Sequence, residues 1–286
     1  MLRPAATIVA AALLITTAPA AAQTVPPGAV PFDAVQGGAV PVSITIQGAG
    51  PFRFVLDTGS TASLIGEPLV RRLGAPLVAQ APVTTASGTS MQGIAEVRQV
   101  LCGGARAEWL HPSVLTAEAL AALVPGVDGI LGQDFLRGRV FTLDYRRGLL
   151  LWGMEGAATA VDLPLALHDG RWLVEVRQPD GRVVTLVPDT GSERLVLFSR
   201  NGRRPLAVQQ APGLAGGALR TMNGQTGVQA VVVPRLALGP LTLRDQAAVL
   251  VARDEPAGPA ADGLLPLHRF SRVTFRTDAG LLVVEP

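Results

Sequence analysis

The sequence predicts an all-β protein that consists of two similar lobes, and two observations carry this prediction. Apolar and alternating runs of about four to eight residues, bounded by glycine and proline, recur along the chain and are typical of β-strands. One set of such runs, with the same motifs between them, occurs twice. Because 48% of the 286 residues are hydrophobic, each copy can bury a sizeable core.

The chain begins with the pattern of a secretory signal. Residues 1–22 contain one early positive charge, Arg3, then an apolar stretch that ends in small residues. The apolar stretch, residues 5–17, is shorter than the roughly 20 residues that cross a bilayer. We therefore expect cleavage after Ala20 or Ala22, no stable membrane span afterwards, and a periplasmic or secreted protein. A retained membrane anchor is the alternative.

Each half continues with two strands that lead into an Asp-Thr-Gly-Ser motif. In the first half we expect strands at 42–46 and 52–56, followed by the motif at 57–60. In the second half we expect strands at 172–176 and 183–187, followed by the motif at 189–192. The two aspartates are 132 positions apart (189 − 57), and this spacing indicates a duplicated unit.

The elements after each motif also repeat. Residues 127–132 read Val-Asp-Gly-Ile-Leu-Gly and residues 261–266 read Ala-Asp-Gly-Leu-Leu-Pro, so each half should place a strand behind its aspartate loop. Strand pairs at 141–152 and 273–284 close the halves. Since the strand pattern lapses into glycine and alanine near residues 153–162, we expect the boundary between the halves there, with lobes at 23–155 and 156–286.

Two short helices are predicted in the first lobe. One spans 67–73 and ends at Gly74, which is a common helix stop. The other spans 116–123, with Thr116 as the N-cap and Pro125 just past the end.

Asp57 and Asp189 are the candidate catalytic residues. An aspartate directly after an apolar strand stands on a tight loop, and Gly59 and Gly191 lack the Cβ that would keep two such loops apart. Two carboxyl groups in contact cannot both ionise easily, so they share one proton and their pKa values split. The ionised carboxylate can then take a proton from water while the protonated carboxyl donates to a substrate carbonyl.

Hydroxyl side chains are expected to support these loops. Thr58 and Thr190 can hydrogen-bond across to the opposite loop and hold the pair in register. Ser60 and Ser192 can donate to the outer carboxylate oxygens, which would lower the pKa values of the pair and predicts an acidic optimum.

Other chemistries find little support in the sequence. All 24 basic residues are arginine, which accounts for the pI of about 9.4, and they are scattered with few aromatics between them, so we expect no nucleic-acid binding. His-Glu-x-x-His and Gly-x-Ser-x-Gly are both missing, and the three histidines stand isolated, so no metal and no cofactor is expected. We interpret those histidines, and Cys102 with its apolar neighbours, as surface or structural residues. The histidines are His111, His168 and His268.

Residues 54–60, Phe-Val-Leu-Asp-Thr-Gly-Ser, and 128–136, Asp-Gly-Ile-Leu-Gly-Gln-Asp-Phe-Leu, resemble the aspartic peptidases of the pepsin and retropepsin superfamily. Residues 57–65 are most similar to the retropepsin-like bacterial members, whereas the duplication in one chain is similar to the pepsin arrangement. The resemblance implies a bilobal pepsin-like double barrel of two pseudo-symmetric retropepsin-like lobes with one or two short helices. It also implies that Asp57 and Asp189 are the dyad of an endopeptidase that cleaves extended peptide or protein substrates.

The resemblance further implies hairpin flaps that cover the site. The candidates are 84–93, with Ser87 and Gly88 at the turn, and 220–227, with Asn223 and Gly224 at the turn. The second segment suits an ordinary surface hairpin almost equally well.

Several alternatives stay open at this point. Pro188 stands before the second aspartate and Pro266 replaces the glycine of the first copy, so the second lobe could sit differently. The aspartates could cap turns in a duplicated β domain, or the protein could bind peptides or envelope material without cutting them. A peptidase that works only as a dimer, or after activation by a partner, is a further alternative.

Overall fold

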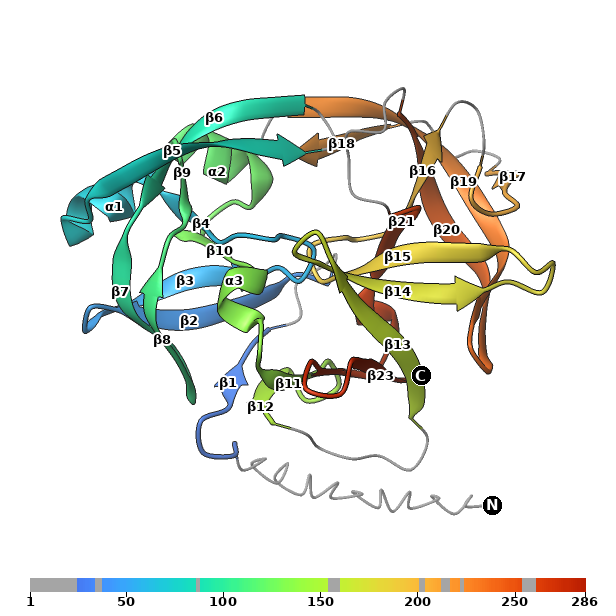
Figure 1. Cartoon of the computed structure of the whole chain (residues 1–286), viewed down its shortest axis with the longest axis horizontal. Helices are drawn as coiled ribbons and strands as arrows, with labels where there is room; N and C mark the ends of the chain where they lie inside the picture. Colours follow the sequence, from blue (N-terminus) through green and yellow to red (C-terminus); the bar gives the residue numbers. More distant parts are fainter. Residues whose placement is uncertain are drawn as a thin grey trace, which may run out of the picture.

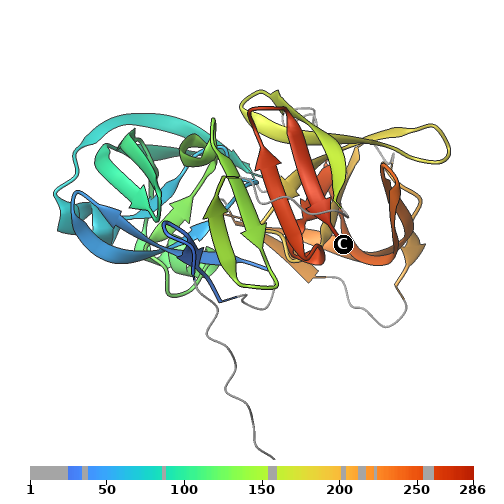
Figure 2. The ribbon, with the colours of Figure 1, turned by 90° about the horizontal axis from the view of Figure 1, so that it is seen from below.

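The computed structural model describes residues 25–33, 38–85, 88–153, 160–200, 204–211, 217–221, 224–253 and 261–286. The predicted signal, residues 1–22, and the flap residues Ser87 and Asn223 lie outside these ranges. Strands dominate the described chain and form two lobes that flank a shared sheet (Figures 1 and 2). The prediction of a bilobal all-β fold is confirmed. Within the same ranges, no helix is long and apolar enough to span a membrane.

The N-terminal lobe is a curled nine-stranded sheet with the order β5-β6-β9-β4-β10-β3-β2-β7-β8. Alternation of side chains along each strand sets its inner face. In β2 every second residue, Val40, Val42, Ile44 and Ile46, is buried. Its strands are β2 (Val40–Ile46), β3 (Ala49–Leu56), β4 (Leu64–Gly66), β5 (Leu77–Thr85), β6 (Gly88–Ala95), β7 (Val97–Cys102), β8 (Ala105–Leu110), β9 (Ser113–Leu115) and β10 (Gly129–Leu131).

Around its aspartate loop the C-terminal lobe repeats the strand order and directions of the first, with β14-β15-β21-β16-β20 matching β2-β3-β10-β4-β9. β15 pairs in parallel with β21 as β3 does with β10, and β16 pairs antiparallel with β21 as β4 does with β10. The duplication seen in the sequence is therefore a duplication of topology. The strands are β13 (Val161–His168), β14 (Arg171–Arg177), β15 (Val183–Asp189), β16 (Leu195–Arg200), β17 (Gln209–Gln210), β18 (Gly217–Thr221), β19 (Gly224–Leu238), β20 (Leu241–Arg253) and β21 (Gly263–Pro266).

The two closing strand pairs meet at the centre of the molecule. Strand β11 of the first half pairs antiparallel with β22 of the second half, which gives the order β1-β12-β11-β22-β23-β13 (Figure 2). The sheet continues from β13 into the C-terminal lobe, so the two halves share one hydrogen-bonded framework. Its additional strands are β1 (Val30–Pro31), β11 (Val140–Asp144), β12 (Leu149–Trp152), β22 (Arg272–Arg276) and β23 (Leu281–Glu285).

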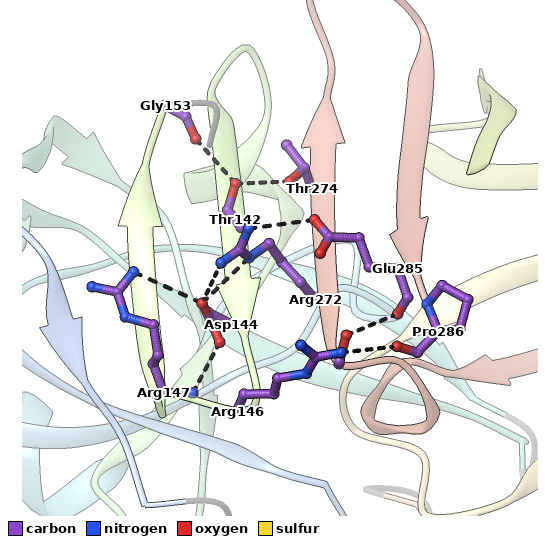
Figure 3. Close-up of polar contacts among 10 residues, drawn as sticks. Thr142, Asp144, Arg146, Arg147, Gly153, Arg272, Thr274, Glu285 and Pro286 are labelled. Carbon is purple, nitrogen blue, oxygen red and sulfur yellow. Dashed lines mark hydrogen bonds and ion pairs between the residues drawn. The ribbon is translucent and has the colours of Figure 1, made fainter. Parts of the chain in front are cut away.

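Polar and aromatic contacts join the halves across this sheet. The hydroxyl oxygens of Thr142 and Thr274 are 2.8 Å apart, and buried Asp144 on β11 accepts a hydrogen bond of 2.8 Å from Arg272 on β22 (Figure 3). On the core side the rings of Phe141 and Phe275 stack with their centroids 4.6 Å apart. These contacts fix the lobes relative to each other and hence the two aspartate loops.

Both predicted helices are present. Helix α1 (Glu67–Leu73) ends at Gly74, whose φ of 62° is the left-handed conformation that glycine adopts readily. Helix α2 (Ala117–Leu123) begins after Thr116, whose hydroxyl accepts a hydrogen bond from the backbone N–H of Ala119. A third helix, α3 (Gln133–Leu136), was not predicted, and a 3-10 turn, η1 (Leu267–Arg269), occupies the equivalent place in the second lobe.

Candidate active site

The two aspartates stand at the carboxyl ends of equivalent strands. Asp57 follows β3 and Asp189 ends β15, and each strand is backed by a parallel neighbour, β10 or β21. In each loop the backbone holds the carboxylate. The N–H groups of Gly59 and Ser60 donate to Asp57 Oδ1 at 2.8 and 3.1 Å, and that of Gly191 donates to Asp189 Oδ1 at 2.7 Å. Both carboxylates are therefore oriented before any ligand is present.

The carboxyl groups of Asp57 and Asp189 lie close together across the lobe boundary, because a Cβ at Gly191 would be 3.2 Å from both Asp57 Oδ1 and Asp189 Oδ1. A side chain at Gly59 would place its Cβ only 2.6 Å from Asp189 Cγ, and one at Gly191 would place it 3.2 Å from Asp57 Cγ. Each glycine thus lies against the opposite aspartate, and any larger residue would push the loops apart.

Crossed threonine contacts hold the loops in register. Thr58 N–H donates to Thr190 Oγ1 and Thr190 N–H donates to Thr58 Oγ1, both at 3.1 Å. Each hydroxyl in turn donates a hydrogen bond to the opposite strand. Thr58 donates to Pro188 O at 2.8 Å and Thr190 donates to Leu56 O at 2.6 Å. Both threonines are fully buried, so the network is shielded from competing water.

The two prolines of the second copy fit this arrangement. Pro188 takes the place of Leu56, where the threonine needs only a backbone carbonyl, and proline retains its carbonyl. Pro266 replaces Gly132, whose N–H donates to the hydroxyl of Ser63. The equivalent of Ser63 is Leu195, which has no hydroxyl to accept a hydrogen bond. The N–H group that proline lacks is therefore not needed at this place.

The expectation for the two serines was wrong. The hydroxyl of Ser60 donates to Ala62 O and that of Ser192 donates to Arg194 O, each at 2.7 Å. Each hydroxyl therefore donates within its own loop, to the carbonyl two residues ahead, and not to the outer carboxylate oxygen. The argument for an acidic optimum from serine donation therefore fails.

Burial governs the protonation of the pair. Burial raises the pKa of Asp57. It raises the pKa of Asp189, which is 7% exposed, by more, because the charge of Asp57 adds to the effect of burial. The backbone N–H groups and the positive charge of Arg171 oppose these shifts. The pair consequently keeps one proton at pH values where an exposed carboxyl group has lost its own.

The Asp-Gly motif of each rear strand has a structural reason. Asp128 accepts a hydrogen bond from Arg53 N at 2.9 Å and Asp262 accepts one from Thr185 N at 3.0 Å. Each therefore holds the strand that leads into the catalytic aspartate of its lobe, β3 or β15. Any side chain at the following glycine, Gly129 or Gly263, would collide with the backbone of β4 or β16. These strands form the base on which the aspartate loops rest.

Gln133 was quoted in the motif but given no role by the sequence analysis. Its fully buried amide donates to Thr58 O at 2.6 Å and accepts from Trp172 N–H at 3.3 Å. It therefore joins one aspartate loop to the start of strand β14 in the other lobe. The sequence signal for this role is weak, because a polar residue at the start of a four-residue helix predicts no long-range partner.

Both flap candidates form hairpins in the described residues. Gly88 pairs with Thr85 at the start of β6, and Gly224 pairs with Thr221 at the start of β19. The sequence predicted both glycines in the turns, but each is the first residue of the returning strand. Strand β18 contacts helix α2 of the other lobe. The β5–β6 hairpin approaches β18 along the same edge of the molecule (Figure 1).

The remaining candidates lie apart from the dyad. His111 and His168 are exposed beside Glu96 and Asp169, and His268 is partly buried against Gly38. Cys102 is buried, which raises the pKa of its thiol to about 12 and leaves it unreactive. In the part of the chain that the structure covers, no three His, Cys, Asp or Glu residues are grouped as a metal site would require.

Comparison with known families gives a direct result. The family model described as aspartyl protease matches the chain twice, at residues 42–135 and 174–267. Each match contains one Asp-Thr-Gly loop and its rear strand. None of the curated proteins compared with the chain matches it. Because the two matches cover most of the chain, it belongs to the aspartyl protease family, in a duplicated retropepsin-like form.

Proposed function

We propose that this protein is an exported aspartic endopeptidase in which Asp57 and Asp189 together activate water. The observation that carries the proposal is the close approach of two carboxyl groups, one from each lobe, on loops that the crossed threonine hydrogen bonds hold together. Such a pair retains one proton, so it contains a base and an acid at the same time.

The geometry supports a reaction without a covalent intermediate. A water molecule between the carboxyl groups gives a proton to the ionised carboxylate and attacks the peptide carbonyl carbon. The protonated carboxyl donates its hydrogen to the carbonyl oxygen as the tetrahedral intermediate forms. The dyad then gives a proton to the leaving nitrogen and takes one from a hydroxyl of the intermediate, so that the C–N bond breaks and a carboxylic acid and an amine form. The dyad ends with one proton, as it began.

Incubation with a mixed peptide library at several pH values tests this proposal. The wild type is expected to cleave peptides internally, and Asp57→Asn and Asp189→Asn are each expected to lose at least about a thousandfold in kcat/KM, because the dyad acts as a unit. Asp245→Asn, an exposed aspartate of β20, is the matched control. Equal cleavage by the wild type and both dyad variants would sink the assignment, and peptide binding without cleavage would favour a non-catalytic binding protein.

Export is proposed on separate grounds. The early positive charge, the apolar stretch and the small residues of 1–22 support removal of a signal. Expression of the full chain followed by cell fractionation and N-terminal sequencing tests this. Recovery from the periplasm or medium with a new N-terminus near residue 21 or 23 is expected, whereas an intact N-terminus in the cytoplasm contradicts it.

A further inference from the structure

The strand register sets Arg171 beside Asp189. β14 and β15 are antiparallel with Val174 opposite Leu186, so continuing this register by three residues sets Arg171 opposite Asp189. Side chains two positions apart share a face of a strand. On this face Leu173 and Val187 pack in one apolar cluster, and Arg171 and Asp189 come next on the same face.

The charge of Arg171 acts on both members of the dyad. Its positive charge lowers the pKa of Asp57 and of Asp189, and burial in turn lowers the pKa of Arg171 itself. Arg272, by contrast, is paired directly with Asp144. Within the described residues, no side chain or carbonyl accepts a hydrogen bond from the Arg171 guanidinium or forms an ion pair with it. A partly buried cation with free donors has a strong tendency to bind an anion.

The backbone on both sides of Arg171 is anchored to the other lobe. Trp172 N–H donates to Gln133 Oε1 at 3.3 Å, and the guanidinium of Arg137 donates to Gly170 O at 2.9 Å. Both partners belong to α3 or its C-terminal end. The start of β14 is therefore held in place, so little ordering remains to be done when a ligand binds.

The cation is present on one side of the dyad only. In the first lobe, β2 and β3 are paired with Val40 opposite Leu56, so the position equivalent to Arg171 is Ala39. Because the copies differ here, the two directions from the dyad along a bound peptide meet different charges.

We propose that Arg171 is a specificity-determining residue that binds the carboxylate side chain of an aspartate or glutamate close to the scissile bond of a peptide substrate. This inference rests on the proposed endopeptidase function and names its substrate class. Arg171 lies on the Asp189 side, so the acidic side chain is expected on one side of the scissile bond and not on both.

Matched peptides test the inference. One cleavable peptide is varied by placing glutamate or glutamine at each position near the scissile bond, and the ratio of kcat/KM for the two is measured. At one position the wild type is expected to favour glutamate by about tenfold or more, which is the usual scale for a charged hydrogen bond. Arg171→Gln is expected to reduce this ratio to about one. The ratio cancels any general effect on the dyad.

Arg177→Gln is the matched control, because Arg177 lies at the exposed end of the same strand on the same face and donates to Gly181 O. It should keep the glutamate preference of the wild type. A wild-type ratio near one at every position, or an unchanged ratio in Arg171→Gln, overturns the inference. Peptides with amidated C-termini are cleaved with the same preference if a side chain is bound, and loss of the preference on amidation would mean that a terminal carboxylate is recognised instead.

A binding assay separates this inference from the proposed function. In Asp57→Asn, fluorescence anisotropy of labelled glutamate and glutamine peptides is compared with and without Arg171→Gln. Preferential binding of the glutamate peptide that depends on Arg171, with no cleavage by the wild type, supports the inference and contradicts the endopeptidase. Cleavage by the wild type without any acidic preference does the reverse.

Discussion

Asp189 is a carboxyl group that the fold keeps in a position unfavourable for its charge. Burial and the charge of Asp57 raise its pKa in the folded state above the value of about 3.9 in an unfolded chain. The folded state therefore holds the proton more tightly than the unfolded state does. The stability of the wild type falls as the pH rises from about 4 through this raised pKa.

Replacement of Asp189 by asparagine removes this loss. Asp189→Asn is expected to melt at a higher temperature than the wild type near neutral pH, and the difference is expected to shrink as the pH falls towards 4. Thermal unfolding followed by circular dichroism over this range provides the measurement, with Asp245→Asn as the exposed control. A difference that grows as the pH falls would show that the sign of the shift is wrong.

Gln133 positions the dyad without touching the substrate in the proposed reaction. Its amide hydrogen-bonds to Thr58 O and Trp172 N–H. Gln133→Met should lower kcat by about tenfold or more with little change in KM, because the aspartates are displaced while the surface that binds the peptide is unchanged.

Gln178 provides a control with the same kind of bonds. It is also a buried glutamine, and its amide makes two hydrogen bonds to the backbone of Ala237 in the C-terminal lobe. Gln133→Met and Gln178→Met should each reduce the free energy of unfolding by about 1–3 kcal/mol. Only the former should reduce kcat, and equal effects of both variants on kcat would leave Gln133 with a structural role alone.

At the scale of elements, local chemistry determined what the sequence could predict. Helix α1 was predicted to the residue because Gly74 stops it, and α2 was predicted to within one residue because Thr116 caps it. The strands at the aspartate motifs followed from their alternation and from the duplication. Helix α3 could not be predicted, since four residues present no helical period.

Pairing between distant elements was harder to predict. The strand pairs at 141–152 and 273–284 have the same pattern, and nothing local indicates that β11 selects β22 as its neighbour. The same limit applies to side chains. The threonine contacts follow from the symmetry of two facing loops, whereas the serine hydroxyls donate to backbone carbonyls of their own loops, which only the loop conformation reveals. Arg171 could have been suspected from the register of the strand before Asp189, compared with Ala39 in the first copy.

The whole molecule is stabilised by a sheet to which both halves contribute. Asp144 is 1% exposed on β11 and pairs with Arg272 on β22, so this ion pair joins residues from the two copies (Figure 3). Glu285 lies 3.4 Å from the same guanidinium and neutralises it only in part. Because the ladder runs unbroken from β12 through β22 into the C-terminal lobe, the lobes should unfold together in a single transition.

Asp144→Ala tests this cooperativity. Loss of this buried carboxylate removes a 2.8 Å ion pair with a largely buried arginine, so the variant should lose about 2–4 kcal/mol of unfolding free energy. Asp278→Ala, which removes an exposed pair with Arg276, should cost less than about 1 kcal/mol. Scanning calorimetry should give one transition for each protein, at a lower temperature for Asp144→Ala. Two transitions would mean that each lobe is stable by itself, and the register of the two aspartate loops would then depend on the threonine contacts and Gln133 instead of the shared sheet.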